Sequence, residues 1–483
     1  MAIRVRLTRL GVWKDPDSIE PSCGVLDMLR GSEILRRVVV DYGAIPVNGD
    51  EGTMTSGHIA PDLSFFEEDG KKIDVLCGTH AHDDHIGLLP ALTPYLSNDA
   101  FVLATVPTAA TMEHTWIERI RIRTKRGLEP PFDIFQYYQI LERLEKCGGP
   151  IARPGKYDIA GLPVWVDPRA HINGAAMFEF QIGKTFIAYL GDGCSFDQPG
   201  VRGAPLLPKE RYPHIIAGSD CTYGADRDSD KRTWSGEMDR GYDACAEAVK
   251  RGHPALWFTF GLHRSTALGH EMQRRGLPDI APVFLDGSGR QLSEILTSKH
   301  GRWCELDTPY DISKIGHVRG FRHRQEILEL GGFTVITTPG MGGPGGAGTF
   351  WRRHILPAPG AVAIFTGYVA AGTDGAKILE ADRKRRETGK EETVTLFSEE
   401  EDEDGVSRVV KEEIPLRCKI AHIRAGSHDS RGKILEEFRT YRPEVLVLSH
   451  GSHAALQSLE QELKSEIPHV FRADKTRSVE LEL

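Results

Sequence analysis

Four side chains that commonly bind metals fall within the short segment THAHDDHIG, residues 79–87. His80 and His82 are two apart on an expected loop, and Asp84 and His85 come at the expected first turn of a helix. Imidazole and carboxylate donors at this spacing favour divalent metals of intermediate softness, above all zinc. Because Asp84 is an anion, it would help to hold a second Zn²⁺ beside the first. The segment predicts a metal centre rather than a chance cluster of surface histidines.

The elements that must position these residues are visible as apolar runs followed by turns that contain glycine. Expected strands lie in residues 36–43, 72–80, 186–193, 214–224 and 444–453. Expected helices with apolar residues three and four apart lie in residues 137–147 and 433–441. Strands and helices that alternate along a chain in this way predict a layered α/β architecture.

Length and composition limit the class of protein. The chain has 483 residues with a formal charge of −9, from 60 basic and 69 acidic residues. Since one packed core stops growing near ~250–300 residues, we expect two domains or one domain with a large insertion. A hydrophobic share of 40% excludes a disordered or fibrous chain. The acidic balance speaks against a nucleic-acid partner on composition alone.

Cysteine usage and hydropathy point to a compartment. The eight cysteines are scattered without a C-x-x-C pair, and the N-terminus is typical of a strand rather than a signal peptide. No run approaches the ~18 apolar residues needed to cross a bilayer. We therefore expect a cytoplasmic protein with no membrane partner.

The pattern H-x-H-x-D-H after a buried strand resembles the signature of the metallo-β-lactamase superfamily. Other residues follow in the order that the superfamily has them. Asp41 ends an early strand near the site, His171 resembles the third histidine, and Asp192 resembles the aspartate that bridges two metals. The last histidine ligand is His450 or His453, of which His450 fits the strand end and the H-G pattern better.

The long stretch between Asp192 and His450 resembles the β-CASP insertion of nucleases that process RNA and DNA. Its first motif is SDCTYG with Asp220, and FTFGLHRSTALGHEMQ carries Arg264 at the family's arginine position. A glycine-rich TTPGMGGPGGAG precedes IFTGYVAAGTDGAKIL, and AGSHDSRGKILEEF then carries His428. The last motif usually reads H-G-E, and here Ser452 replaces the glutamate.

The resemblance implies an α/β fold, a metallo-β-lactamase αββα sandwich with an inserted α/β β-CASP domain. We expect residues 1–217 to form the first part of the metallo-β-lactamase domain. Residues 218–417 would form the insertion, and residues 418–483 would close the first domain.

The resemblance also implies a ligand set for two Zn²⁺ ions, with Mn²⁺ as the alternative metal. The expected ligands are His80, His82 and His171 for one ion, Asp84, His85 and His450 for the other, and Asp192 between them.

The expected catalytic residues are Asp84, His428 and Asp220. His428 would protonate the leaving oxygen, and Asp220 would orient it. Arg264 and the loop 340–348, with Gly342, Gly343 and Gly345, would contact the substrate phosphates.

The predicted function is that of a zinc-dependent ribonuclease acting on single-stranded RNA, as an endonuclease, a 5′–3′ exonuclease or both. The alternatives are a DNA nuclease of the same family, a small-molecule metallo-hydrolase and an inactive scaffold subunit. The sequence leaves a homodimer open.

Charged segments complete the prediction. The basic segments 119–126 (RIRIRTKR) and 317–324 (HVRGFRHR) are either tracks for a phosphodiester backbone or solvated faces. The segments 380–393 and 399–404, the latter EEEDED, predict a solvated loop.

Overall fold

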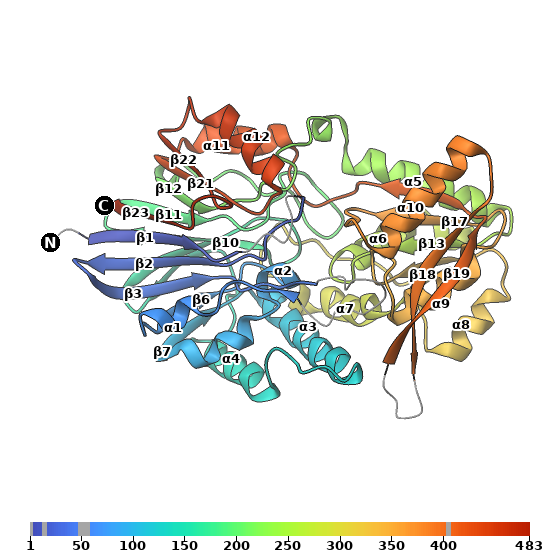
Figure 1. Cartoon of the computed structure of the whole chain (residues 1–483), viewed down its shortest axis with the longest axis horizontal. Coiled ribbons are helices and arrows are strands. Elements are labelled where there is room, and N and C mark those ends of the chain that lie inside the picture. Colours follow the sequence, from blue (N-terminus) through green and yellow to red (C-terminus); the bar gives the residue numbers. More distant parts are fainter. Residues whose placement is uncertain (1–2, 12–16, 47–57, 402–406) are drawn as a thin grey trace.

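The protein forms two lobes that lie side by side (Figure 1). The computed structural model describes residues 3–11, 17–46, 58–401 and 407–483. Both ends of the chain lie in the first lobe, and the middle of the chain forms the second. The first lobe is therefore closed by segments from both ends of the sequence.

The first lobe contains two facing sheets. The strands of the six-stranded sheet are, in order, β23 (Ser478–Glu482), β1 (Ile3–Arg9), β2 (Gly24–Arg30), β3 (Glu33–Val40), β6 (Ile73–Cys77) and β7 (Leu96–Leu103). The seven-stranded sheet has the order β22 (His469–Arg472), β21 (Val445–Leu448), β12 (Ile215–Gly218), β11 (Thr185–Tyr189), β10 (Ala176–Ile182), β9 (Leu162–Pro168) and β8 (Gly155–Ile159). A small ladder joins β4 (Ile45–Pro46) to β5 (His58–Ile59).

The sheets are buried on both faces, which explains the unbroken apolar run in β3. Val38 and Val40 pack into the core between the two sheets, together with Phe178 of β10. Val39 faces the other way and packs with Trp116 under the helices. Strands covered on both faces have nearly continuous apolar sequences, as this one does.

Helices cover the outer face of each sheet. Those on the first sheet are α1 (Phe65–Glu68), α2 (Asp83–Ile86), α3 (Val106–Lys125) and α4 (Ile134–Lys146). Those on the second are α11 (Arg431–Tyr441) and α12 (His453–Leu463). The four layers form the expected αββα sandwich, and that prediction is confirmed.

The second lobe is a parallel sheet with helices on both faces. Its strand order is β15 (Gly316–His317), β14 (Val283–Asp286), β16 (Thr334–Thr337), β13 (Ala255–Phe258), β17 (Val362–Thr366) and β20 (Lys419–Ile423). Its helices are α5 (Trp234–Lys250), α6 (Arg264–Arg274), α7 (Ser288–Thr297), α8 (Phe321–Leu328), α9 (Gly346–Ile355) and α10 (Asp374–Thr388). This is the inserted α/β domain.

The prediction of a solvated loop at 380–404 was wrong for the described residues. Residues 380–388 belong to α10, and β18 (Glu392–Glu401) pairs with β19 (Ser407–Leu416) in a long antiparallel hairpin that projects from the second lobe (Figure 1). Residues 402–406 of the acidic run lie outside the described residues. The hairpin forms because Val394 and Leu396 bury one of its faces against the lobe, despite the acidic composition.

One strand bears on the expected domain boundary at residue 417. Strand β20 (Lys419–Ile423) pairs in parallel with β17 in the sheet of the second lobe. A boundary at 417 would cut that sheet, so we propose that the insertion continues through Ile423.

The structure also shows the state of the cysteines and the character of the helices. All eight cysteines lie in the described part of the chain and are free thiols. None of the helices in that part is long and apolar enough to cross a bilayer.

A core substitution tests the packing between the sheets. Phe178 is fully buried there, so Phe178→Ala should reduce the free energy of unfolding by about 3–5 kcal/mol. Urea denaturation measures this change. The matched control is Phe135→Ala, at a side chain 73% exposed on α4, which should change stability by less than about 0.5 kcal/mol. Equal urea midpoints for Phe178→Ala and the native chain would contradict the burial of Phe178 between the two sheets.

Candidate active site

The metal-binding motif follows β6 and is fixed by backbone hydrogen bonds from neighbouring segments. Tyr42 N donates to the His85 carbonyl at 2.8 Å, and Ser22 N donates to the Asp84 carbonyl at 2.7 Å. Gly43 lies so close that a Cβ there would come within 1.8 Å of the Asp84 carbonyl oxygen. The motif is therefore held rigidly before any ligand binds.

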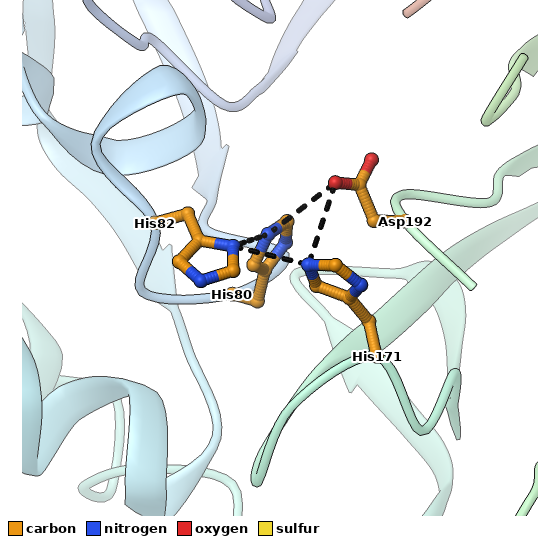
Figure 2. Close-up of side chains that lie close together, drawn as sticks. All are labelled: His80, His82, His171 and Asp192. Carbon is orange, nitrogen blue, oxygen red and sulfur yellow. Dashed lines mark hydrogen bonds and ion pairs between the residues drawn. The ribbon is translucent and has the colours of Figure 1, made fainter. Parts of the chain in front are cut away.

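Three imidazoles and one carboxylate converge at the first predicted site, as Figure 2 shows. His82 Nδ1 lies 3.1 Å from both His80 Nε2 and His171 Nε2. Asp192 Oδ2 lies 3.7 Å from the same two nitrogens. These separations suit donors that share one cation with metal–nitrogen bonds of ~2.0–2.1 Å.

The second predicted site lies directly beside the first. His85 Nε2 is 3.2 Å from His450 Nε2, which is 3.3 Å from Asp84 Oδ2. His450 adopts a left-handed backbone conformation, with φ of +49°, at the end of β21. Such strain in a residue other than glycine is common at functional sites. It turns the His450 imidazole towards His85 and Asp192.

Asp192 connects the two sites. Its Oδ1 is 3.1 Å from His450 Nδ1 and 3.3 Å from His85 Nε2. This oxygen is buried and has no hydrogen bond of acceptable geometry. A buried carboxylate oxygen without a hydrogen bond, surrounded by imidazole nitrogens, fits a cation between these groups. The donor set therefore fits a divalent metal centre.

The electrostatics of the two sites differ. Burial, with the neighbouring imidazoles, lowers the pKa of His80 and His171, and burial lowers that of His82 to about 4. Burial also acts on His85, but the carboxylates of Asp192 and Asp41 outweigh it and raise its pKa to about 10. The first site thus presents neutral imidazoles, the form that binds metals, and at the second a metal would displace protons.

Two other hydrogen bonds orient the ligands. Asp41, expected near the site, accepts from His85 Nδ1 at 2.8 Å, which leaves His85 Nε2 for the metal. His171 Nδ1 donates to the carbonyl of Ser427 at 2.8 Å and leaves its Nε2 free in the same way. Partners of this kind fix the tautomer and direction of a ligating imidazole.

His428 and Asp220, predicted as a catalytic pair, meet beside the metal site. His428 Nδ1 lies 2.8 Å from Asp220 Oδ2 and 3.9 Å from Asp192 Oδ2. Asp220 also accepts from the backbone of Gly193 and of Thr222, at 3.1 and 3.0 Å. Burial opposes charge on His428, but Asp220 outweighs it and raises the pKa of this imidazole.

The predicted substrate contacts lie in different surroundings. Arg264 is buried, and its Nη2 donates to Ser427 Oγ at 2.6 Å, next to His428. In the loop 340–348, a Cβ at Gly343 would meet open space. The Gly342 carbonyl accepts a hydrogen bond from Arg352 Nη1, and Gly345 lies against the carboxylate of Glu399. The roles of these four residues in binding stay predictions.

Ser452 and His453, the two points of ambiguity in the last motif, lie at a helix start. Ser452 accepts from Ala455 N and caps α12. His453 Nε2 is 3.7 Å from Asp474 and joins none of the metal-binding groups found among the described residues. Of the two candidate histidines, the structure brings His450 to the site.

Sequence reasoning missed several polar residues that support the site. Gln198 accepts from Ser427 Oγ at 2.8 Å and donates to the His171 carbonyl at 3.0 Å. Asp429 accepts from the backbone of Ser195 at 2.8 Å. Asp429 could have been noticed, because it directly follows His428. Gln198 gave no signal, because an isolated glutamine has no spacing to interpret.

Comparison with known proteins agrees with this geometry. Residues 49–168 match the model of the Metallo-beta-lactamase superfamily. The chain is 26% identical to the transcription termination factor FttA of Methanothermobacter thermautotrophicus, over 99% of this chain and 71% of that protein. It is 26% identical to FttA of Methanocaldococcus jannaschii, over 82% of this chain and 60% of that one. It is 24% identical to RNase aCSPSF2 of Saccharolobus solfataricus, over 89% and 77%.

The sandwich and its cluster of histidine and aspartate side chains define a metal-dependent hydrolase. The chain resembles the metallo-β-lactamase superfamily over residues 49–168, and its relatives over most of its length include a transcription termination factor and an RNase. It spans about three-fifths to three-quarters of the length of these relatives.

The two late histidines offer a matched test of the metal site. His450→Ala should lower affinity for the second metal by more than about 100-fold, since even partners of ligands contribute ~10–100-fold. Metal analysis of the dialysed protein measures the loss. His453→Ala, three residues away on the same turn, should keep the native metal content. If His453→Ala lost metal and His450→Ala did not, the assignment would be reversed.

Proposed function

We propose that this chain is a ribonuclease that hydrolyses phosphodiester bonds of single-stranded RNA with the help of two zinc ions. The observation that carries the proposal is the His428–Asp220 pair at the edge of the metal site. The relatives named as an RNase and as transcription termination factors support RNA as the substrate.

We assign one zinc to the three-histidine group and one to the group that contains Asp84. Asp192 would help to hold either ion, because one of its oxygens faces the imidazoles of the first group and the other faces those of the second. When bound, the ions would neutralise the phosphoryl oxygens and make an attacking water more acidic.

The chain's own residues then supply the proton for the leaving oxygen. Asp220 accepts from Nδ1 of His428, which leaves Nε2 as the nitrogen that can give a proton. Because Asp220 raises the pKa of His428, the imidazole is protonated more fully near neutral pH and is ready to donate. A proton donor positioned in this way typically contributes ~10²–10⁴-fold to the rate.

Arg264 supports a phosphate as the group that enters this site. Its Nη1 is buried and has no hydrogen-bond partner, and burial lowers its pKa to about 10. A buried guanidinium without a full set of acceptors is costly to the fold. A phosphate oxygen beside His428 would satisfy it, since arginine pairs well with phosphate.

Digestion of end-labelled strands tests the proposed activity. RNA and DNA of one sequence are incubated with the zinc-loaded protein and with protein stripped by a chelator. We expect RNA to be cut by the loaded protein alone. Equal cleavage of DNA would favour the DNA-nuclease alternative, and the product lengths distinguish internal from 5′-end cleavage.

Replacing the proposed proton donor separates catalysis from metal binding. His428→Ala should lower kcat for RNA by about 10²–10⁴-fold while both metals remain bound. Turnover and metal content are measured on the same preparation. A loss of metal that matches the loss of turnover would identify His428 as a ligand and contradict the proposed role.

Replacing Arg264 should affect activity and stability differently. Arg264→Gln removes a charge-assisted contact worth about 1.5–3 kcal/mol, so kcat/KM for RNA should fall about 10–150-fold. The melting temperature should stay the same or rise, because a costly buried charge disappears. Parallel losses of stability and activity would show that Arg264 is merely structural.

A further inference from the structure

Three arginines lie along one face of α3, in the basic segment whose role the sequence left open. Arg119, Arg123 and Arg126 are separated by four and three residues, which places them on a common helical face. Arg126 is the C-cap residue directly after the helix. Arg121 points elsewhere, with its side chain 72% exposed and paired with Glu118. The alternating arginines of the segment 119–126 therefore lie on two faces of the helix, one with the arginine row and one that faces solvent.

The inner end of the row meets the metal-binding motif. Arg119 Nη2 lies 2.9 Å from Asp83 Oδ1, and Asp83 stands between the ligands His82 and Asp84. The Arg119 side chain is only 12% exposed. The row therefore begins within one residue of two metal ligands.

The outer end of the row meets the second lobe. Arg126 Nε and Nη2 lie 3.0 and 2.6 Å from Glu399 Oε1, on the β18–β19 hairpin. The same carboxylate lies against Gly345, where a Cβ would come within 2.8–2.9 Å of it. Glu399 is the first residue of the acidic run, so the basic and acidic runs of the sequence meet here. A carboxylate of the chain itself thus occupies a place between an arginine and the glycine-rich loop.

The charges of the two outer arginines act on Arg123 in the middle of the row. Burial, and then the charges of Arg119 and Arg126, lower the pKa of Arg123. Like charges three and four residues apart destabilise an isolated helix. Arg123 Nε donates to the Glu129 carbonyl at 2.7 Å, and an anion that lies along the row would further offset the repulsion among the three guanidinium groups.

We propose that this arginine row binds the RNA strand that leads to the metal centre, and that Glu399 occupies the outermost phosphate position until RNA displaces it. The inference rests on the proposed ribonuclease function. Seven steps of helix separate Arg119 from Arg126 and span about 10.5 Å at ~1.5 Å each, a distance over which a strand presents more than one phosphate. Guanidinium groups pair with phosphate as they do with the carboxylate of Glu399.

The test measures binding of a fluorescein-labelled, phosphorothioate-linked single-stranded RNA as salt is raised. Arg123→Gln should weaken binding about tenfold and reduce the slope of log affinity against log salt by about 0.7, the contribution of one phosphate. Arg123→Lys keeps the charge and should restore the slope. Arg121→Gln, on the solvated face of the same helix, is the matched control and should leave the slope unchanged.

Glu399→Gln tests whether the Glu399 carboxylate and an RNA phosphate compete for Arg126. Removing this carboxylate should strengthen RNA binding several-fold and lower KM while kcat stays the same. Weaker binding by Glu399→Gln would mean that Glu399 only holds Arg126 in place, and an unchanged slope for Arg123→Gln would overturn the arginine row. If either of these two results is found while the native protein still cuts RNA, only the arginine-row inference is refuted. A native protein that cuts no RNA would refute the proposed function itself.

Discussion

The carboxylate of Asp192 is buried, and five imidazoles have a nitrogen within 4 Å of it. The distances are 3.1 Å to His450, 3.3 Å to His85, 3.7 Å to His80 and His171, and 3.9 Å to His428. A buried carboxylate requires close compensating groups, and several of them here lie at or just after strand ends in both sheets of the first lobe. His80 follows β6 of one sheet, whereas Asp192 and His450 follow β11 and β21 of the other. The core between the sheets must therefore hold these strand ends together, and the outer helices stabilise that core.

The need to keep these strand ends together also limits where a second lobe can be inserted. Strands β12 and β21 are parallel neighbours, although the whole insertion separates them along the chain. The chain leaves the sheet just before Asp220 and returns through His428 before β21 begins. Consequently the two connections to the inserted lobe carry the two members of the proposed proton-donating pair. A shift of that lobe would change the 2.8 Å contact between them, so its position bears directly on the proposed catalysis.

The convergence of the candidate metal ligands could be predicted from the sequence because each is a rare residue type at a fixed place relative to a strand. The support around them could not, since Gln198 and Ser427 are ordinary polar residues that meet only in the folded chain. The β18–β19 hairpin could have been predicted from the spacing of its apolar residues, although its composition is acidic. The buried side chains Val394 and Leu396 are two residues apart, as are Ile414 and Leu416, and apolar residues at this spacing indicate a strand even in an acidic segment.

For a related reason, the net charge says little about the proposed RNA partner. At physiological salt, exposed charges farther apart than about 8 Å are largely screened from one another. A phosphate on α3 would therefore respond mainly to the nearest guanidinium and to Glu399, and hardly to a formal charge of −9 spread over 483 residues. The total includes acids such as those of the 399–404 run, which would discourage unspecific binding of nucleic acid elsewhere. Acidic residues elsewhere and the proposed arginine row would together favour a strand that reaches the metal centre over one that binds anywhere else.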